Sequence, residues 1–222
     1  MAKSLRRRIA PYLLALTMIL GGGDLFWPLH RDLRQFDPVA VAALETRMWQ
    51  AYYDRKPLAL FLELAEALRT QYHFPWLRSW LGAWFGASAA FSFKDGKGRE
   101  DYERALPALR NYFALIRNTD EPGFDVQRAA TLELEWWIAH RQRDRYGTDA
   151  IGQACAEAAA LLYGLPVSAT LKHGRLRAAA MAIRDAREET GGLTDADWDR
   201  INGLLKQSYQ SLQQALLAAG LR

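Results

Sequence analysis

Residues 37–55, DPVAVAALETRMWQAYYDR, hold the signals that decide how this 222-residue chain folds. Asp37 is suited to cap a helix N-terminus, and Pro38 to the first helical turn, where no backbone N–H is needed. Apolar side chains then recur at helical spacing and form one stripe: Val41, Leu44, Met48 and Tyr52. The segment therefore predicts an amphipathic helix that packs on a core.

Similar signals recur to the end of the chain, and we find no alternating strand pattern of useful length. Prolines, capping residues and glycines divide the sequence into eight predicted helices, which span residues 37–55, 57–72, 75–92, 100–118, 125–145, 148–163, 168–189 and 194–220. Pro107 either kinks the fourth helix or marks its true start. Eight helices joined by short turns predict an all-α fold, a single helical-bundle domain over residues 37–222. An α-solenoid of helical hairpins is the alternative.

The positive charge of the chain is confined to its first residues. The sequence has 29 basic and 25 acidic residues, a net charge of +4, and residues 1–8 (MAKSLRRR) contain four basic residues and no acidic one. The remainder is therefore balanced at 25 of each. A nucleic-acid-binding domain needs a basic face that displaces counterions from phosphates, so we expect no nucleic-acid partner.

An apolar run follows the basic residues, as in export signals. We expect residues 9–29 to form a signal-anchor or transmembrane helix in contact with membrane lipid, with Trp27 at the lipid–water interface. The N-terminus would then be cytoplasmic, with a linker at 30–36 and an extracytoplasmic, periplasm-like helical domain. Cleavage near Gly23, which would release a soluble exported protein, is the alternative.

The predicted helix 75–92 has an unusual composition. Its tryptophans recur every four residues, and Gly82 and Gly86 have the spacing that lets another helix approach closely. Three interpretations stay open: a central buried helix, a second membrane segment over 76–93, or an aromatic face that rests on a membrane or a partner protein. The contact candidates of this helix are Trp76, Trp80, Trp84, Gly82 and Gly86.

Three ionisable side chains are expected on faces rich in aromatic residues. Glu45 falls between Trp49 and Tyr52 on a helical projection, and Glu133 and His140 point along the apolar face of helix 125–145. A buried carboxylate must be paired, hydrogen-bonded or protonated. These groups therefore form a hydrogen-bonded network with tyrosines, tryptophan N–H groups or an arginine such as Arg47, or they act in acid–base catalysis, or they bind a metal.

Other motifs carry little chemistry. None of the four histidines has a glutamate three residues before it, and no His-x-x-x-His occurs, so we expect no metal site of a known helical type. The cofactor, if any, is unknown. The lone Cys155 is expected as a small core residue. Helix 168–189 carries arginines beside acidic residues, among them Arg177, Arg184 and Asp185, and we expect a solvated, salt-bridged face.

Two functions remain as expectations. The first is a non-enzymatic, membrane-tethered accessory or scaffold subunit that docks on a larger membrane-associated assembly through aromatic and small-residue helix faces. The alternative is a helical enzyme, or a binder of an apolar ligand or cofactor, with its pocket between helices 37–55 and 125–145. Glu45, Glu133 and His140 would be the working groups of that pocket.

Overall fold

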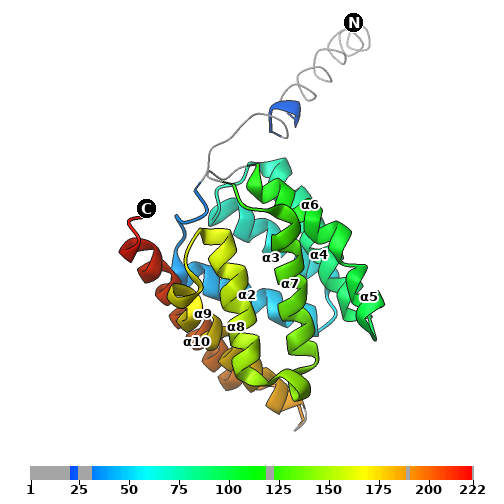
Figure 1. The fold of residues 1–222 in the computed structure, drawn as a ribbon. Helices are drawn as coiled ribbons and strands as arrows, with labels where there is room; N and C mark the ends of the chain where they lie inside the picture. The colour runs from blue at the N-terminus through cyan, green and yellow to red at the C-terminus, as the bar shows by residue number, and fades with distance from the viewer. Residues whose placement is uncertain (1–20, 25–31, 119–122, 189–190, 222) are drawn as a thin grey trace, which may run out of the picture.

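The computed structural model describes residues 21–24, 32–118, 123–188 and 191–221, and these described residues contain helices but no strand (Figure 1). The helices are α2 (Pro38–Tyr53), α3 (Pro57–Thr70), α4 (Trp76–Lys94), α5 (Arg99–Glu103), α6 (Leu106–Arg117), α7 (Val126–Arg141), α8 (Arg143–Tyr163), α9 (Val167–Glu188) and α10 (Asp195–Ala218). The all-α prediction and the helical bundle are confirmed.

Most helix ends lie where the capping residues predict them. Asp37 accepts hydrogen bonds from two backbone N–H groups of the first turn of α2, and Asp125 caps α7 by accepting one, from Arg128. Thr194 and Asp197 form a reciprocal capping box at the start of α10. Gly164 ends α8 in the left-handed conformation that favours glycine.

Two helix boundaries differ from the prediction. The helix expected over 100–118 is divided into α5 and α6, and Pro107 lies in the first turn of α6, so the alternative that Pro107 marks a helix start is the correct one. The helix expected over 125–145 ends at Arg141. The backbone leaves helical geometry at Gln142 and again at Gly147, whose φ is 74°. The second break separates the first residues of α8 from the rest of that helix.

The eight long helices form a closed circle, which we call the helix ring. Along the chain, α2, α3, α4, α6, α7, α8, α9 and α10 each pack against the next, and α10 packs against α2. In an open solenoid the first and last helices would lie at opposite ends. The contact between α2 and α10 therefore makes this arrangement a closed bundle rather than a solenoid.

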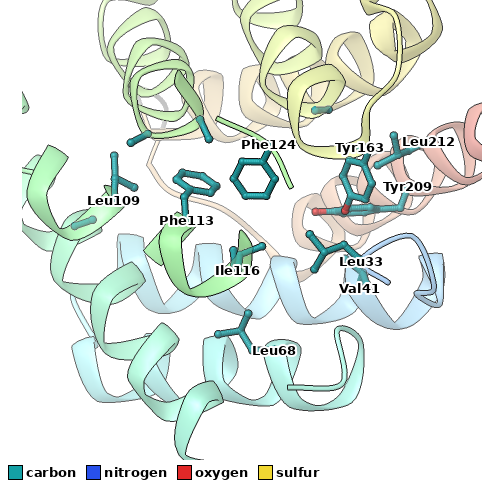
Figure 2. Packing of buried hydrophobic residues seen from close by; sticks show 14 of the residues in the cluster. Leu33, Val41, Leu68, Leu109, Phe113, Ile116, Phe124, Tyr163, Tyr209 and Leu212 are labelled. Atoms are coloured by element: carbon teal, nitrogen blue, oxygen red, sulfur yellow. The ribbon is translucent and has the colours of Figure 1, made fainter. Parts of the chain in front are cut away.

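One end of the helix ring is filled with apolar side chains. Figure 2 shows Phe113 and Phe124 close together, with Tyr163 and Tyr209 from later helices beyond them. The rings of Phe113 and Phe124 are 6.1 Å apart and meet edge to face. Leu33 and Phe36 are also buried here, so the described part of the expected linker 30–36 packs into the core.

The structure corrects the buried-helix interpretation of residues 75–92. Trp76, Trp80 and Trp84 of α4 are 58%, 41% and 63% exposed. The opposite face of α4 is made of small residues. A Cβ on Gly82 would lie 2.7 Å from Leu68 of α3 and 3.2 Å from Leu115 of α6. The small residues face the core because they let two helices approach closely, which leaves the tryptophans outside.

The expected anchor helix over residues 9–29 lies almost wholly outside the described residues. Residues 1–8, most of 9–29 and Trp27 lie outside the described residues. No helix within the described ranges, α4 included, combines the length and the apolar character needed to cross a bilayer. We call residues 1–29 the leader. Within it the helical turn 21–24 is described, and Asp24 contacts the start of α4. A carboxylate oxygen of Asp24 accepts a hydrogen bond from the backbone N–H of Leu77 at 2.7 Å.

The close contact between α8 and α9 leads to a stability prediction. A Cβ on Gly174 of α9 would lie 2.1 Å from the backbone oxygen of Gly152 and 2.7 Å from the backbone nitrogen of Ala156. We expect Gly174→Ala to lower the free energy of unfolding by about 2 kcal/mol or more, because backbone atoms must move apart. Chemical denaturation followed by circular dichroism measures the change.

Gly203 supplies the matched control. It lies inside α10, and a Cβ built there meets no atom within 4 Å. Gly203→Ala should raise the free energy of unfolding by up to about 1 kcal/mol, because alanine is the better helix former. Equal stability of the two variants would contradict the packing of α8 on α9.

Candidate functional site

A cavity of about 690 Å³ occupies the interior of the helix ring. All eight long helices contribute side chains to its wall. Much of the wall is aromatic, including Trp49, Tyr72, Tyr112, Trp136, Trp137 and Tyr163. Glu45, Glu133 and His140 all line this one cavity. The sequence placed these three side chains between the first and fifth predicted helices, and closure of the helix ring brings those helices to a shared interior.

Glu45 lies at the centre of a buried polar cluster. Arg177 of α9 holds both of its carboxylate oxygens, with N–O distances of 2.8 and 2.6 Å. The Tyr209 hydroxyl of α10 donates to the same carboxylate at 2.5 Å, and the Trp49 indole N–H donates at 3.1 Å. Every partner is a hydrogen-bond donor, so the cluster fits an ionised Glu45. It joins α2, α9 and α10.

The arginine in this cluster was not the one expected. Arg47 pairs with Glu63 at 2.8 Å on the outer surface, because it lies two residues from Glu45 and so on the far side of α2. The solvated face predicted for 168–189 is also wrong for Arg177, whose side chain is only 12% exposed. Burial opposes the charge of Arg177, but Glu45 outweighs that effect and raises the pKa of the guanidinium above its usual value.

Glu133 of α7 is held differently. The indole N–H of Trp137 donates to its carboxylate at 3.0 Å. Burial raises the pKa of Glu133, and hydrogen bonds from Trp136 and Trp137 together with the charge of Arg177 offset this effect only in part. Glu133 therefore favours the neutral, protonated form more than an exposed glutamate does. A protonated carboxyl group can donate a hydrogen bond into the cavity as well as accept one.

His140, in the last turn of α7, pairs with Asp185. Its Nε2 lies 3.0 Å from a carboxylate oxygen of Asp185, which also contacts Arg184 at 3.1 Å and Arg143 at 3.6 Å. Burial opposes ionisation of Asp185, but the hydrogen bond and charge of His140 and the two arginines outweigh it and lower the pKa of the carboxyl group. Asp185 is thus an ionised, mostly buried partner of His140, which the predicted solvated face did not foresee.

Basic side chains gather at the end of the cavity where α2, α4, α7 and α9 end and α8 begins. We call this group the rim: Arg55, Lys94, Arg141, Arg143 and Arg184. Arg55 and Arg141 are exposed, which marks where the cavity reaches the surface. The opposite end is closed by buried side chains such as Leu33, Tyr163 and Leu212.

The interior also holds His173, which the sequence did not single out, and Cys155, which is buried as the sequence predicted. Burial and the charge of Arg177 lower the pKa of His173 to about 3, so this histidine is neutral at physiological pH. Burial raises the pKa of Cys155 to about 12, so its thiol stays protonated and unreactive. His173, Arg177, Met181 and Arg184 recur at steps of three or four residues, and that stripe is the signal that α9 faces a shared interior.

Two further observations bear on the chemistry of the site. Within the described parts of the chain, no group of three or more histidine, cysteine, aspartate or glutamate side chains is close enough to hold a metal ion. Comparison with protein-family models, with curated proteins and with solved structures found no match to this chain. The function must therefore be argued from the residues of the cavity.

The raised pKa of Glu133 predicts a pH-dependent stability. Below about pH 4.5 the carboxyl is protonated in both the folded and the unfolded chain; above it, the unfolded chain ionises first and the folded state loses relative stability. Glu133→Gln removes this penalty. Between pH 4 and 8 we expect the free energy of unfolding of this variant to rise relative to that of the wild type. The rise is about 1.4 kcal/mol for each unit by which the pKa of Glu133 in the folded chain exceeds its pKa in the unfolded chain.

Glu135→Gln is the control, because Glu135 pairs with Arg99 at 2.7 Å on the outside of α7. Urea denaturation at several pH values gives the comparison. The difference in free energy of unfolding between Glu135→Gln and the wild type should stay small throughout this pH range. If the difference in free energy of unfolding between Glu133→Gln and the wild type does not change with pH, the raised pKa of the Glu133 carboxyl group is contradicted.

Proposed function

We propose that this protein binds a small organic molecule in the cavity inside the helix ring. The observation that carries the proposal is the cavity itself: about 690 Å³, lined by aromatic side chains and by a few polar groups held in fixed positions. Small-molecule sites in proteins are commonly about 300–1,000 Å³ with such a lining. The mainly aromatic wall favours a ligand with an apolar, planar or ring-containing body.

The polar groups would fix the orientation of this ligand. Glu45 and Arg177 neutralise each other and are held by Tyr209, so they supply a rigid polar wall rather than a free charge. Glu133, with its raised pKa, would donate or accept a hydrogen bond deeper in the cavity. Binding, rather than a particular reaction, is the function that these contacts support.

A neutral fluorescent probe tests the proposal. N-phenyl-1-naphthylamine brightens in apolar surroundings, and we expect it to bind the full-length protein with a dissociation constant of about 1–10 μM, typical of a modest apolar ligand. Ala90→Trp places a bulky side chain on the cavity wall of α4 and should weaken binding at least about tenfold by filling the space. Fluorescence titration measures both constants.

Ser92→Trp is the matched control, since Ser92 is exposed on the same helix and does not line the cavity. It adds the same side chain and should leave the dissociation constant unchanged. If the probe fails to bind the wild type, or binds both variants equally well, the cavity is not the binding site and the proposal is wrong.

We also propose a second function, a membrane-tethered accessory subunit. The observation that favours it is an exposed apolar patch on α4 beside the attachment of the leader. The patch comprises Trp76, Leu77, Trp80, Leu81 and Trp84. Trp76 stacks on Trp80 with ring centres 5.0 Å apart, and Asp24 contacts the backbone of Leu77. Tryptophan suits a lipid–water interface, and a leader inserted in a bilayer would hold this patch near its surface.

Cell fractionation tests the tether. With Leu14→Arg and Leu16→Arg together, two charges enter the apolar run, and the full chain should move from the membrane to the soluble fraction, because a charge within a membrane segment is unfavourable. Leu58→Arg and Leu62→Arg, on the exposed surface of α3, are the control and should remain in the membrane fraction. A wild-type protein found wholly in the soluble fraction would contradict the tether.

A further inference from the structure

We infer that the cavity takes an amphipathic organic anion whose acidic group lies at the rim and whose apolar body extends inward between the tryptophans. This inference rests on the proposed function and deepens it, since it names the charge and the orientation of the ligand. It is carried by the uneven distribution of charged side chains along the cavity wall. Residues 9–222 have equal numbers of basic and acidic residues, so this unevenness does not come from the overall charge.

The positive charge of the cavity is concentrated at its open end. The rim holds five basic side chains. Among the described residues two acidic side chains accompany them: Asp185, engaged by His140, Arg143 and Arg184, and Asp95, which pairs with Arg55 at 3.2 Å. Cations grouped around an opening with low-dielectric walls attract anions and raise their local concentration. Arginine side chains also match the geometry of carboxylate, sulfonate and phosphate groups.

The deeper part of the cavity is close to neutral. The charge of Arg177 is balanced by Glu45, His173 is neutral, and the raised pKa of Glu133 favours its protonated form. A charged ligand group placed there would lose its hydration without gaining an unbalanced partner. The acidic group therefore belongs at the rim, and the apolar body belongs inside.

The rim cations also have a structural role, which the test must separate from binding. The Lys94 ammonium donates to the backbone oxygen of Tyr52 at 2.7 Å, and Arg141 donates to the backbone oxygen of Lys94 at 3.3 Å. These contacts satisfy the C-terminal ends of α2 and α4, where cations are favourable. If stabilising the helix ends were their whole role, the charge of a ligand would not affect its affinity.

Two matched probes separate these roles. 1-Anilinonaphthalene-8-sulfonate is N-phenyl-1-naphthylamine with one added sulfonate group, so the ratio of their dissociation constants reports the effect of the negative charge alone. We expect the sulfonate probe to bind the wild type about tenfold more tightly, as a charge-assisted contact allows. Raising the salt concentration from 50 to 500 mM should reduce this preference, because the rim is open to solvent.

Substitutions then locate the effect. Lys94→Gln with Arg141→Gln should remove most of the preference, because the variant weakens binding of the sulfonate probe more than binding of the neutral probe. Arg143→Gln, a single change that alters neither helix-end contact, should reduce the preference in the same direction. The control is Arg110→Gln with Arg128→Gln, which removes two exposed charges that do not line the cavity and should preserve the ratio.

The outcomes distinguish this inference from the proposed function. If both probes bind the wild type equally well, the ligand is not selected by its charge and this inference is wrong, while cavity binding stands. If the rim variants and the control lose the preference equally, the rim does not hold the acidic group. If neither probe binds at all, the proposed function itself fails.

Discussion

Everything else in the structure depends on the closure of the helix ring between α2 and α10. If the circle did not close, its first and last helices would each lack one neighbour, and the helices would not share an interior. The buried contact of Glu45 with Arg177 and Tyr209 lies at this seam and joins the first long helix to the last two. Breaking such a pair by removing one partner typically costs about 3–5 kcal/mol, because the other charge stays buried.

The closure also explains why the cavity exists. The circle of eight helices encloses a cavity of about 690 Å³, and buried apolar side chains close the end away from the rim. An empty apolar space of this volume would be strongly destabilising. The wall of this cavity instead presents tyrosine hydroxyls, carboxyl groups and guanidinium groups, which water or a polar ligand can satisfy.

The two proposed functions are compatible because they use different surfaces. The cavity opens at the rim, where α2, α4 and α7 end, and the exposed tryptophans lie along the outside of α4 from its beginning. Asp24 meets that beginning of α4, so the leader joins the bundle at the end away from the rim. A tethered protein would thus keep the opening of its cavity directed away from the leader.

The sequence alone determined the helices, because their signals are local. Asp37, Asp125 and Thr194 cap helix starts through hydrogen bonds to residues two or three positions away, and Pro107 acts on its own backbone. Helical periodicity also placed Glu45, Glu133 and His140 on aromatic faces, since three or four residues make one turn.

Only the tertiary structure decided what those faces meet. Arg177 is 132 residues from Glu45 in the sequence, and although helical periodicity places Arg177 on one stripe of α9, no local signal pairs it with Glu45. The tryptophans of α4 have the spacing of a buried stripe, yet glycine and alanine face the core because close helix approach favours small side chains. Contacts between distant segments are set by the closure of the whole circle, which no single stretch of sequence encodes.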